Sequence, residues 1–181
     1  MISAPSGAGK TSIIREVVRM RNDCTFSVSS TTREPRENER EGVDYHFLKR
    51  EEFIKRIDNG EFAEWAEVHQ HLYGTEHSAI MKELSNGKNV ILDIDVIGGK
   101  NIKVQYPDSL FIFIYPPSYE VLEERLRNRG LDSDEAIQRR LSRYPMEMEM
   151  GKQYTHKVVN NNLQEAIDEV MSIIEKEVSN G

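Results

Sequence analysis

Residues 2–12 of the chain read ISAPSGAGKTS, and this stretch decides the fold that the rest of the sequence must build. Gly9, Lys10 and Thr11 fill the last three positions of the pattern G-x-x-x-x-G-K-[S/T], which joins a strand to a helix. Successive backbone N–H groups in such a turn form a concave anion site, and the helix N-terminus adds the positive end of its dipole. The stretch therefore predicts a nucleotide-binding P-loop made of Ala4, Pro5, Ser6, Gly7, Ala8, Gly9, Lys10 and Thr11.

One position departs from the pattern, because Ala4 stands where glycine is usual. A methyl group is tolerable there only if the backbone keeps a negative φ. The alternative is an ordinary glycine-rich turn before a helix. The context favours the P-loop, since an amphipathic helix follows with Ile13, Ile14 and Val17 on one face. Lys10 would then reach the outer phosphates and the Thr11 hydroxyl would bind Mg²⁺.

Length and composition bound the class of protein. The 181 residues correspond to one domain or one domain with insertions, and the formal net charge of −7 argues against general attraction to nucleic acid or to anionic membrane. The single cysteine, Cys24, fits a reducing compartment. No apolar run is long enough for a membrane span, and the chain enters its phosphate loop at once. We therefore expect no signal peptide and a cytoplasmic location, while monomer and homodimer both remain open.

The order of elements predicts the fold class. Strands are expected at Cys24–Ser29, Asn89–Asp95, Leu110–Tyr115 and His156–Asn160, and helices at 10–21, 97–105, 119–129, 134–144 and 163–178. Only Met1–Ser3 precedes the P-loop, so the first strand is either short or missing residues. Strands that alternate with helices predict an α/β fold, a three-layer P-loop NTPase-type structure with a parallel central sheet.

The span 30–87 differs from this alternation. Short strands are expected at Val43–Phe47 and Phe62–Val68, short helices at 50–59 and 78–86, and a turn at Tyr73–Thr75. We expect a small mixed α/β insertion here rather than a strand–helix–strand unit.

Three groups of polar residues are candidates for ligand binding. Asp93 ends an apolar strand, as do the carboxylates that order Mg²⁺ or its water shell in P-loop sites; the alternative is a helix-capping carboxylate. The second group consists of Arg33, Arg36, Tyr45 and Tyr73. Arginines give planar, bidentate phosphate donors, and tyrosine hydroxyls can complete the shell around a phosphate. The alternative is a solvated charged loop, which is the usual meaning of such a charged run. A carboxylate matches the two adjacent donors on the pairing edge of guanine, and hydroxyls can donate to its carbonyl; the candidates are Glu64, Asp95, Ser29 and Thr75.

A fourth group consists of six arginines within nineteen residues: Arg125, Arg127, Arg129, Arg139, Arg140 and Arg143. Arginines on a closing lid can neutralise charge that builds on a transferring phosphoryl group. The alternative is pairing with acidic residues on the helix surface, and we expect two or three of the six to be functional.

Together these stretches resemble guanylate kinases, the nucleoside monophosphate kinases that phosphorylate GMP from ATP. The most specific matches are SVSSTTREPR at 27–36 and LDID at 92–95, and the resemblance runs through nearly the whole chain in order. It implies a P-loop core (1–29, 88–124 and 151–181), a GMP-binding region (30–87) and a helical lid (125–150) that close on each other. It also implies Mg²⁺ as the cofactor, with ATP and GMP as the partners.

The resemblance implies roles residue by residue. The GMP-binding residues would be Ser29, Arg33, Arg36, Tyr45, Glu64, Tyr73, Thr75 and Asp95. ATP would be bound by the P-loop residues 4–11 with Arg125 and Asn160, the latter near adenine. Catalysis would depend on Lys10, Arg33, Arg129 and Arg140, and Mg²⁺ would be held by Thr11 and, through water, by Asp93.

Three other functions compete with this hypothesis. Residues 95–98 spell the D-x-x-G of GTPases, but no N-K-x-D base-reading motif follows. A non-enzymatic guanylate-kinase-like interaction domain is disfavoured because Lys10, Thr11 and the arginines are kept. A kinase for another monophosphate would leave Glu64 and Asp95 unexplained.

Overall fold

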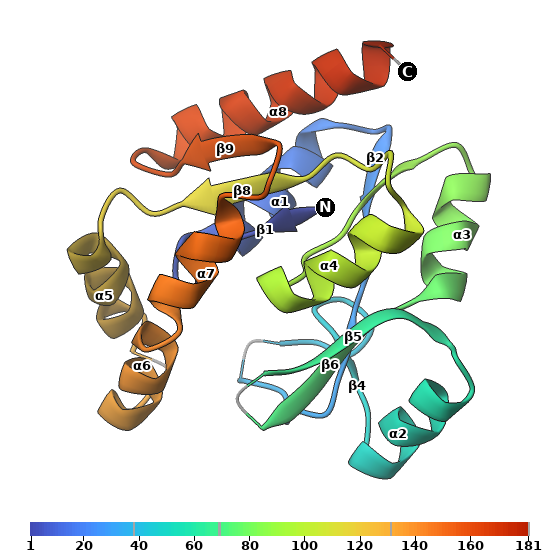
Figure 1. Ribbon diagram of the computed structural model, residues 1–181, viewed down its shortest axis with the longest axis horizontal. Coiled ribbons are helices and arrows are strands. Elements are labelled where there is room, and N and C mark those ends of the chain that lie inside the picture. Colours follow the sequence, from blue (N-terminus) through green and yellow to red (C-terminus); the bar gives the residue numbers. More distant parts are fainter. Residues whose placement is uncertain (38, 69, 131, 181) are drawn as a thin grey trace. The chain divides into compact units, whose positions relative to one another are not determined.

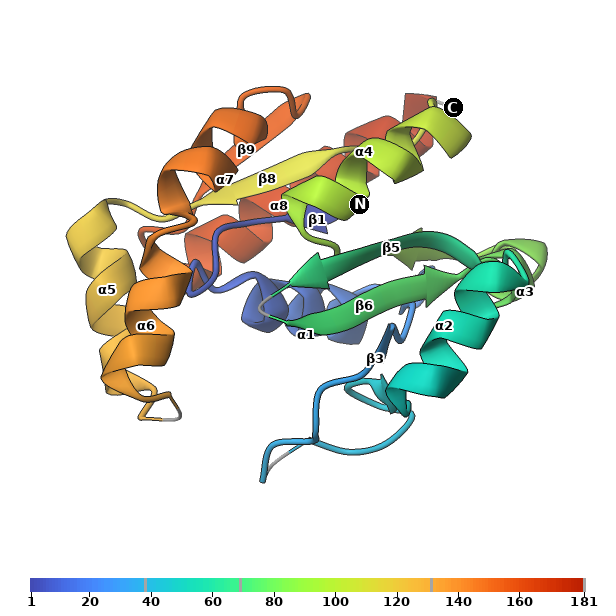
Figure 2. The same cartoon turned by 60° about the horizontal axis from the view of Figure 1, so that its bottom comes forward.

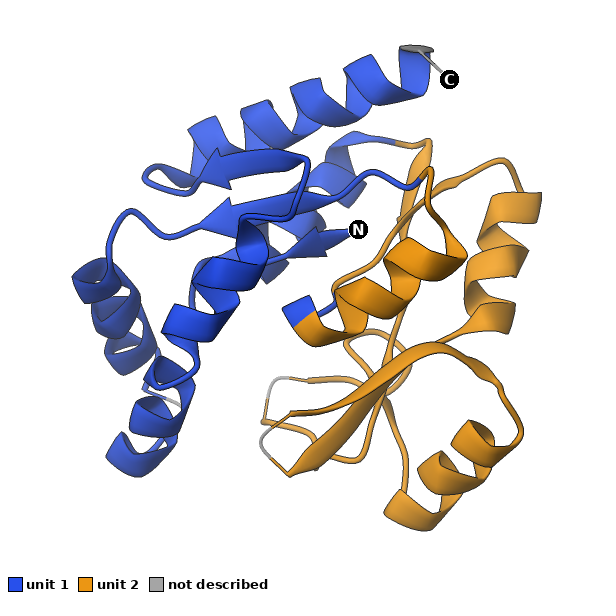
Figure 3. Ribbon diagram, in the orientation of Figure 1, with its two compact units in different colours: residues 1–21, 94–96, 109–181 blue, residues 22–93, 97–108 orange. Residues whose placement is uncertain are grey.

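The computed structural model describes residues 1–37, 39–68, 70–130 and 132–180. The chain divides into two compact units, which Figure 3 colours separately. Unit 1 comprises Met1–Arg21, Ile94–Val96 and Ser109–Gly181, and unit 2 comprises Asn22–Asp93 and Ile97–Asp108. Within the described residues, no helix has both the length and the apolar content that crossing a membrane requires.

Unit 1 is built on a parallel sheet in the order β1-β8-β9. Its strands are β1 (Ile2–Ser3), β8 (Ile112–Tyr115) and β9 (His156–Val159). β1 has two residues, which lie opposite Ile112 and Phe113. Phe113 and Ile114 are completely buried, in keeping with the continuous apolar run that predicts this strand.

Helices cover both faces of this sheet. The helices of this unit are α1 (Lys10–Met20), α5 (Tyr119–Asn128), α6 (Asp134–Leu141), α7 (Tyr144–Gly151) and α8 (Leu163–Asn180), and those on the faces of the sheet are α1, α7 and α8. Gly151 of α7 packs on the ring of Phe113, and Figures 1 and 2 show α7 on one face of the sheet with α1 and α8 on the other. The predicted three-layer α/β arrangement with a parallel sheet is confirmed.

The helix expected over 134–144 is wrong at its C-terminal end. α6 stops at Leu141, and a separate helix, α7, starts at Tyr144 with Pro145 in its first turn. Proline lacks an N–H and is tolerated in a first turn, where that donor has no intrahelical partner. Pro145 therefore marks the beginning of a helix that the sequence analysis did not predict.

Unit 2 contains two sheets. β2 (Cys24–Phe26) and β7 (Asn89–Ile91) form a parallel pair. A mixed sheet in the order β4-β3-β6-β5 is made of β4 (His46–Phe47), β3 (Ser30–Thr31), β6 (His71–Glu76) and β5 (Phe62–Val68). The helices are α2 (Arg50–Asp58), α3 (His77–Ser85) and α4 (Val96–Gln105). The span 30–87 therefore has the mixed α/β content that the sequence predicts. β5 has the expected bounds, β4 is shorter than the expected Val43–Phe47, and β3 is a strand that the sequence analysis did not predict.

The turn predicted at Tyr73–Thr75 is wrong, because these residues lie inside β6, antiparallel to β5 (Figure 2). Glycine at position 74 allows close packing of the two strands. A Cβ at this position would lie 2.9 Å from Cδ1 of Phe62 and 3.0 Å from the carbonyl oxygen of Glu64. The absent side chain lets β6 approach β5 and the stacked rings of Phe53 and Phe62, whose centroids are 4.4 Å apart.

Candidate active site

The P-loop in unit 1 is a turn built by its backbone. Gly7 and Gly9 have φ of 97° and 93°, and the Ala8 N–H donates to the Pro5 carbonyl at 3.0 Å. Gly9 is the N-cap of α1 and no side chain caps that end of the helix. Among the described residues only Gln70 combines a side chain with a positive φ, so Ala4 meets the condition set by the sequence. The loop presents backbone donors at a helix N-terminus, the geometry suited to phosphate.

Asn160, directly after β9, anchors this loop. Its side-chain amide donates to the Ala8 carbonyl at 2.7 Å, and a Cβ on Gly9 would overlap that amide. The guanidinium of Arg125, on α5, donates to the Asn160 carbonyl at 3.0 Å. Two polar atoms in this cluster, Arg125 Nη1 and Asn160 Oδ1, are buried without a hydrogen-bond partner in the described part of the chain. Three elements thus meet at the loop and leave a donor and an acceptor unused.

Lys10 and Thr11 begin α1 with different environments. The Lys10 ammonium donates to the Ile94 carbonyl at 3.3 Å, whereas Thr11 is exposed in the first turn of the helix. Over residues 1–37, 39–68, 70–130 and 132–180, no group of three or more His, Cys, Asp or Glu residues is arranged to hold a metal ion. Mg²⁺ at nucleotide sites needs one or two protein oxygens and completes its shell with phosphates and water, so an exposed Thr11 hydroxyl beside the loop fits this ion.

Asp95 belongs to unit 1. The residue before it, Ile94, is attached to β1, because the Ile94 N–H donates to the Ile2 carbonyl at 3.4 Å. Its carboxylate lies 3.4 Å from Nη2 of Arg143, whose Nε donates to Glu147 at 3.2 Å. Burial raises the pKa of the Glu147 carboxyl, although Arg143 and the backbone N–H of Ser6 both act to lower it. Asp95, Arg143 and Glu147 therefore form one cluster of charged side chains in unit 1.

Other arginines of the fourth group differ in their surroundings. Arg127 pairs with Glu123 and Asp134 on the helix surface, each at 2.7 Å. Arg140 lies 3.2 Å from Asp132 with most of its side chain buried, and Arg129 is exposed at the C-terminal end of α5.

A buried chain of hydrogen bonds crosses unit 2. The Thr75 hydroxyl donates to Glu64 Oε1 at 2.9 Å, and the Ser29 hydroxyl lies 3.1 Å from that of Thr75. Thr75 is fully buried, and Glu64 is only 5 % exposed. The register of β5 and β6 places Glu64 opposite Thr75, which explains how residues eleven apart in sequence meet. The structure thus brings together three of the four residues that we associated with guanine.

The second group also gathers in unit 2. The Arg33 guanidinium donates to the Tyr73 hydroxyl at 3.2 Å and lies 5.5 Å from the ring centroid of Tyr45. The rings of Tyr45 and Tyr73 meet edge to face with centroids 5.9 Å apart. Arg36 reaches the same place through Glu39, which lies 2.8 Å from Arg33 Nη2 and accepts the Arg36 N–H at 2.9 Å. The four residues that the sequence groups as phosphate-binding candidates therefore lie together, with the carboxylate of Glu39 among the arginines.

Burial and charge tune this cluster. Burial lowers the pKa of the Arg33 guanidinium, but its contacts with Glu39 and Tyr73 outweigh that effect and leave the pKa above its usual value. Burial, and next the negative charge of Asp93, raise the pKa of Tyr45. Tyr45 is therefore a hydrogen-bond donor at neutral pH, and Asp93 lies close enough to influence it.

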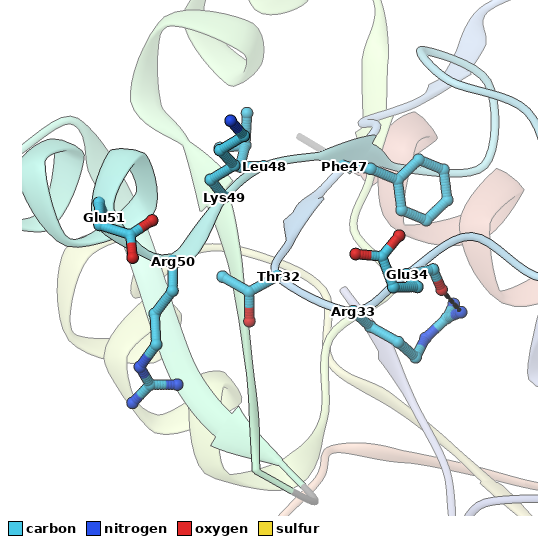
Figure 4. A pocket seen from close by; sticks show the side chains of 8 residues that line it. All are labelled: Thr32, Arg33, Glu34, Phe47, Leu48, Lys49, Arg50 and Glu51. Atoms are coloured by element: carbon cyan, nitrogen blue, oxygen red, sulfur yellow. Dashed lines mark hydrogen bonds between the residues drawn. The ribbon is translucent and has the colours of Figure 1, made fainter.

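A pocket of about 430 Å³ lies on unit 2 between the segments 32–34 and 47–51 (Figure 4). Arg33 lines this pocket, and its guanidinium donates a hydrogen bond to the Glu34 carbonyl at 2.7 Å (Figure 4). Ser29, Glu64 and Thr75 are not part of its lining. This pocket is therefore distinct from the hydroxyl–carboxylate chain.

Two residues of these clusters escaped the sequence analysis. Glu39 sits in a charged run that is typical of a solvated loop, and only its position three residues after Arg36 hints at a contact. Glu147 lies between methionines and carries no signal that separates it from Glu149. Both acquire a role through partners that the fold supplies.

Comparisons with known proteins agree with the geometry. The family model "Guanylate kinase" matches residues 1–177. A guanylate kinase of Thermotoga maritima is 45% identical over 177 residues, covering 98% of this chain and 86% of the relative. A guanylate kinase of Myxococcus xanthus is 45% identical over 175 residues, covering 96% and 84%.

The fold comparison gives the same family. The crystal structure of guanylate kinase from Anaplasma phagocytophilum matches with a TM-score of 0.78 at 30% identity, covering 97% of this chain and 83% of that one. The chain belongs to the guanylate kinase family.

Proposed function

We propose that the chain is an ATP:GMP phosphotransferase, which moves the γ-phosphoryl group of ATP to GMP and yields ADP and GDP. The observation that carries this proposal is the buried chain Ser29–Thr75–Glu64. A buried carboxylate costs free energy unless it gains partners, and guanine offers two adjacent donors on its pairing edge. Adenine would present an acceptor to the same carboxylate and be repelled. The chain of contacts thus supports a guanine site in a molecule that also has a P-loop.

ATP is assigned to unit 1. The backbone donors of residues 4–11 and Lys10 bind the phosphates, and Arg125 offers its unused Nη1 to the nucleotide. Asn160 holds the loop through Ala8 and leaves Oδ1 toward the donor nucleotide. Arg129 and Arg140 supply positive charge for the transferred group.

The GMP phosphate is assigned to Arg33, Arg36, Tyr45 and Tyr73 of unit 2. The planar guanidinium groups match phosphate oxygens, and the two tyrosine hydroxyls donate to the phosphate. Burial raises the pKa of Tyr45, which keeps its hydroxyl protonated. The base is assigned to Ser29, Glu64, Thr75 and Asp95.

The chemistry requires positioning rather than a strong base. The attacking oxygen belongs to the GMP phosphate, which is already ionised near neutral pH. Catalysis therefore comes from alignment of the two phosphates and from neutralisation of charge on the transferred group by Lys10, Arg33, Arg129 and Arg140. Exclusion of water by a lid of residues 125–150 prevents transfer of the phosphoryl group to water.

Thr11, and Asp93 through water, are the residues assigned to Mg²⁺. When bound with ATP, this ion neutralises charge on the β- and γ-phosphates. The P-loop core is assigned to residues 1–29, 88–124 and 151–181, and the GMP-binding region to residues 30–87. A cytoplasmic location accords with Cys24, which is buried and forms no disulfide.

The test is ADP release from ATP with GMP, AMP, CMP and UMP in parallel, with and without Mg²⁺. The expected result is turnover with GMP alone and only in the presence of the ion. Equal turnover with AMP would contradict the guanine assignment, and hydrolysis of GTP without GMP would favour a GTPase. Tight GMP binding with no turnover would indicate an interaction domain.

A further inference from the structure

Thr31, the last residue of β3, and Thr32 both contact β6 through their hydroxyl groups. The Thr31 hydroxyl donates to the Leu72 carbonyl at 3.0 Å, and the Thr32 hydroxyl accepts the Leu72 N–H at 2.9 Å. Thr31 is completely buried, and Leu72 belongs to the apolar cluster that includes Phe53 and Phe62. Both hydroxyls therefore attach this segment to a well-packed part of unit 2.

The Thr31 hydroxyl has a second contact, which reaches a residue of the proposed phosphate site. Its Oγ1 accepts the backbone N–H of Arg33 at 3.2 Å, while its own proton is donated to Leu72. Because a hydroxyl has one proton and two lone pairs, donation to Leu72 fixes its rotation and leaves a lone pair for the Arg33 N–H. Thr31 therefore fixes the backbone of Arg33 at the point where the chain leaves β3.

The side chain of Arg33 is attached to the same strand, at the next residue. Its Nε donates to the Tyr73 hydroxyl at 3.2 Å, and Tyr73 lies opposite Thr31 in the register of β3 and β6. Arg33 is thus attached to β6 twice, through its backbone by way of Thr31 and through its guanidinium at Tyr73. An arginine side chain has many rotamers, so attachment at both ends restricts the directions in which the guanidinium can point.

We propose that Thr31 is a positioning residue, whose hydroxyl fixes the direction of Arg33 toward the phosphate of the acceptor nucleotide. The inference rests on the proposed function in that Arg33 contacts this phosphate. Thr31 acts through the backbone of Arg33 and makes no contact with the nucleotide. All the residues involved belong to unit 2.

Two valine variants separate this role from support of the sheet. Thr31→Val keeps the shape of the buried side chain but removes the acceptor of the Arg33 N–H. The Leu72 carbonyl keeps a donor in that variant, the Thr32 N–H at 3.0 Å. Thr32→Val is the matched control, because it removes the acceptor of the Leu72 N–H and leaves the Thr31 hydroxyl in place. Thr31→Ser keeps a hydroxyl at the buried position.

The first measurement is the KM for each substrate. In Thr31→Val the KM for GMP is expected to rise about threefold to tenfold, the range for one neutral hydrogen bond, while the KM for ATP does not change. Thr31→Ser is expected to return the KM for GMP to within about twofold of the unmodified chain. Thr32→Val is expected to lower the denaturation midpoint, because the Leu72 N–H loses its acceptor, and to change the KM for GMP by less than about twofold. An equal rise of this KM in both valine variants would overturn the proposal.

A double-mutant cycle with Arg33→Met shows whether Thr31 acts through Arg33. Arg33→Met alone is expected to lower kcat/KM for GMP about tenfold or more, because a charged donor to the phosphate is lost. Thr31→Val, added to Arg33→Met, is expected to have little further effect, since the group that it positions is absent. A purely structural role gives effects that multiply, and that result would also overturn the proposal.

Loss of fold is monitored by thermal unfolding of each variant. If Thr31→Val does not fold, Thr31→Cys takes its place in the same measurements, since a thiol is a similar but much weaker acceptor. The expected direction of every effect is unchanged, and multiplicative effects in the cycle with Arg33→Met remain the contrary result.

Failure of the proposed function is recognisable separately, as absence of GMP turnover by the unmodified chain. Failure of the role of Thr31 appears instead as multiplicative effects in a chain that turns over GMP. Where turnover is absent, calorimetric dissociation constants for GMP replace kcat/KM in the cycle, and the same coupling between Thr31 and Arg33 is expected. An unmodified chain that does not bind GMP at all would overturn both proposals.

Discussion

Unit 1 and unit 2 each present a phosphate-binding candidate, but they build it from different materials. In unit 1 the donors are backbone N–H groups, fixed by a glycine-rich turn and an uncapped helix N-terminus. In unit 2 the donors are Arg33, Arg36 and two tyrosines, held in place by other side chains. A backbone site is encoded in adjacent residues, whereas a side-chain site depends on strand register and on partners that lie elsewhere in the sequence.

The comparison predicts where single substitutions act. Within the P-loop of unit 1, Lys10 is the phosphate donor that can be removed without rebuilding the loop, since the backbone N–H groups supply the other donors of the turn. Lys10→Met is expected to lower kcat about a hundredfold to a thousandfold, the range for loss of one preorganised donor to a developing charge. Turnover with saturating GMP and ATP measures it, and Lys55→Met, exposed on α2, is the control. Unchanged turnover would remove Lys10 from the mechanism.

In unit 2 the largest effect is expected at Glu64. Glu64→Gln replaces one acceptor with a donor inside a buried chain, so kcat/KM for GMP falls about tenfold to a hundredfold while that for AMP does not fall. Parallel assays with the two acceptors measure the selectivity. Glu67→Gln changes the same strand at an exposed residue that pairs with Arg50 and serves as the control. Equal losses with GMP and AMP would show that Glu64 supports the sheet rather than the base.

Gly74 tests whether unit 2 depends on close approach of its strands. Gly74→Ala places a methyl group against Phe62 and a backbone carbonyl, and such overpacking is expected to cost about 1–3 kcal/mol of unfolding free energy. Because Tyr73 and Thr75 flank this position, the KM for GMP also rises. Gly87→Ala has nothing within 4 Å of the added methyl group but lies at a φ of 72°, so it is expected to cost stability through backbone strain while it leaves the KM for GMP unchanged. Chemical denaturation and initial rates supply the two readouts, and an unaffected KM in Gly74→Ala would be the contrary result.

The smallest expected effect concerns Glu39, which contacts both Arg33 and Arg36. Glu39→Ala removes an acceptor for Arg33 and one for the Arg36 N–H, so the KM for GMP rises about threefold while the KM for ATP does not change. Glu37→Ala, an exposed residue of the same segment, is the matched control. A fall in the KM for GMP would mean that Glu39 competes with phosphate instead of positioning the arginines.

The same division explains what the sequence could reveal. The turn of the P-loop, the start of α5 at Tyr119 and the bounds of β5 follow from neighbouring residues, and the structure confirms them. β6 was mistaken for a turn because the need for Gly74 comes from Phe62 and Glu64 across the sheet. α7 was missed because a proline can either end a helix or stand in the first turn of the next one, and Pro145 was interpreted as an end.

The candidate site divides in the same way. Ser29, Glu64 and Thr75 were grouped from the chemistry of a base edge, and the structure brings them into one hydrogen-bonded chain. Glu39 and Glu147 could not be found, because their partners are chosen by tertiary structure and no local pattern separates them from other exposed glutamates. The roles of all these residues in binding remain predictions for the assays above.

The bond from Asn160 to the Ala8 carbonyl spans 152 positions of sequence. During synthesis, the phosphate loop leaves the ribosome long before the strand that carries its anchor. A nascent chain that ends before β9 therefore contains the complete nucleotide motif without the hydrogen bond that anchors it. Capture of a nucleotide becomes a late event of biogenesis, and it reports that the last strand of the sheet has docked.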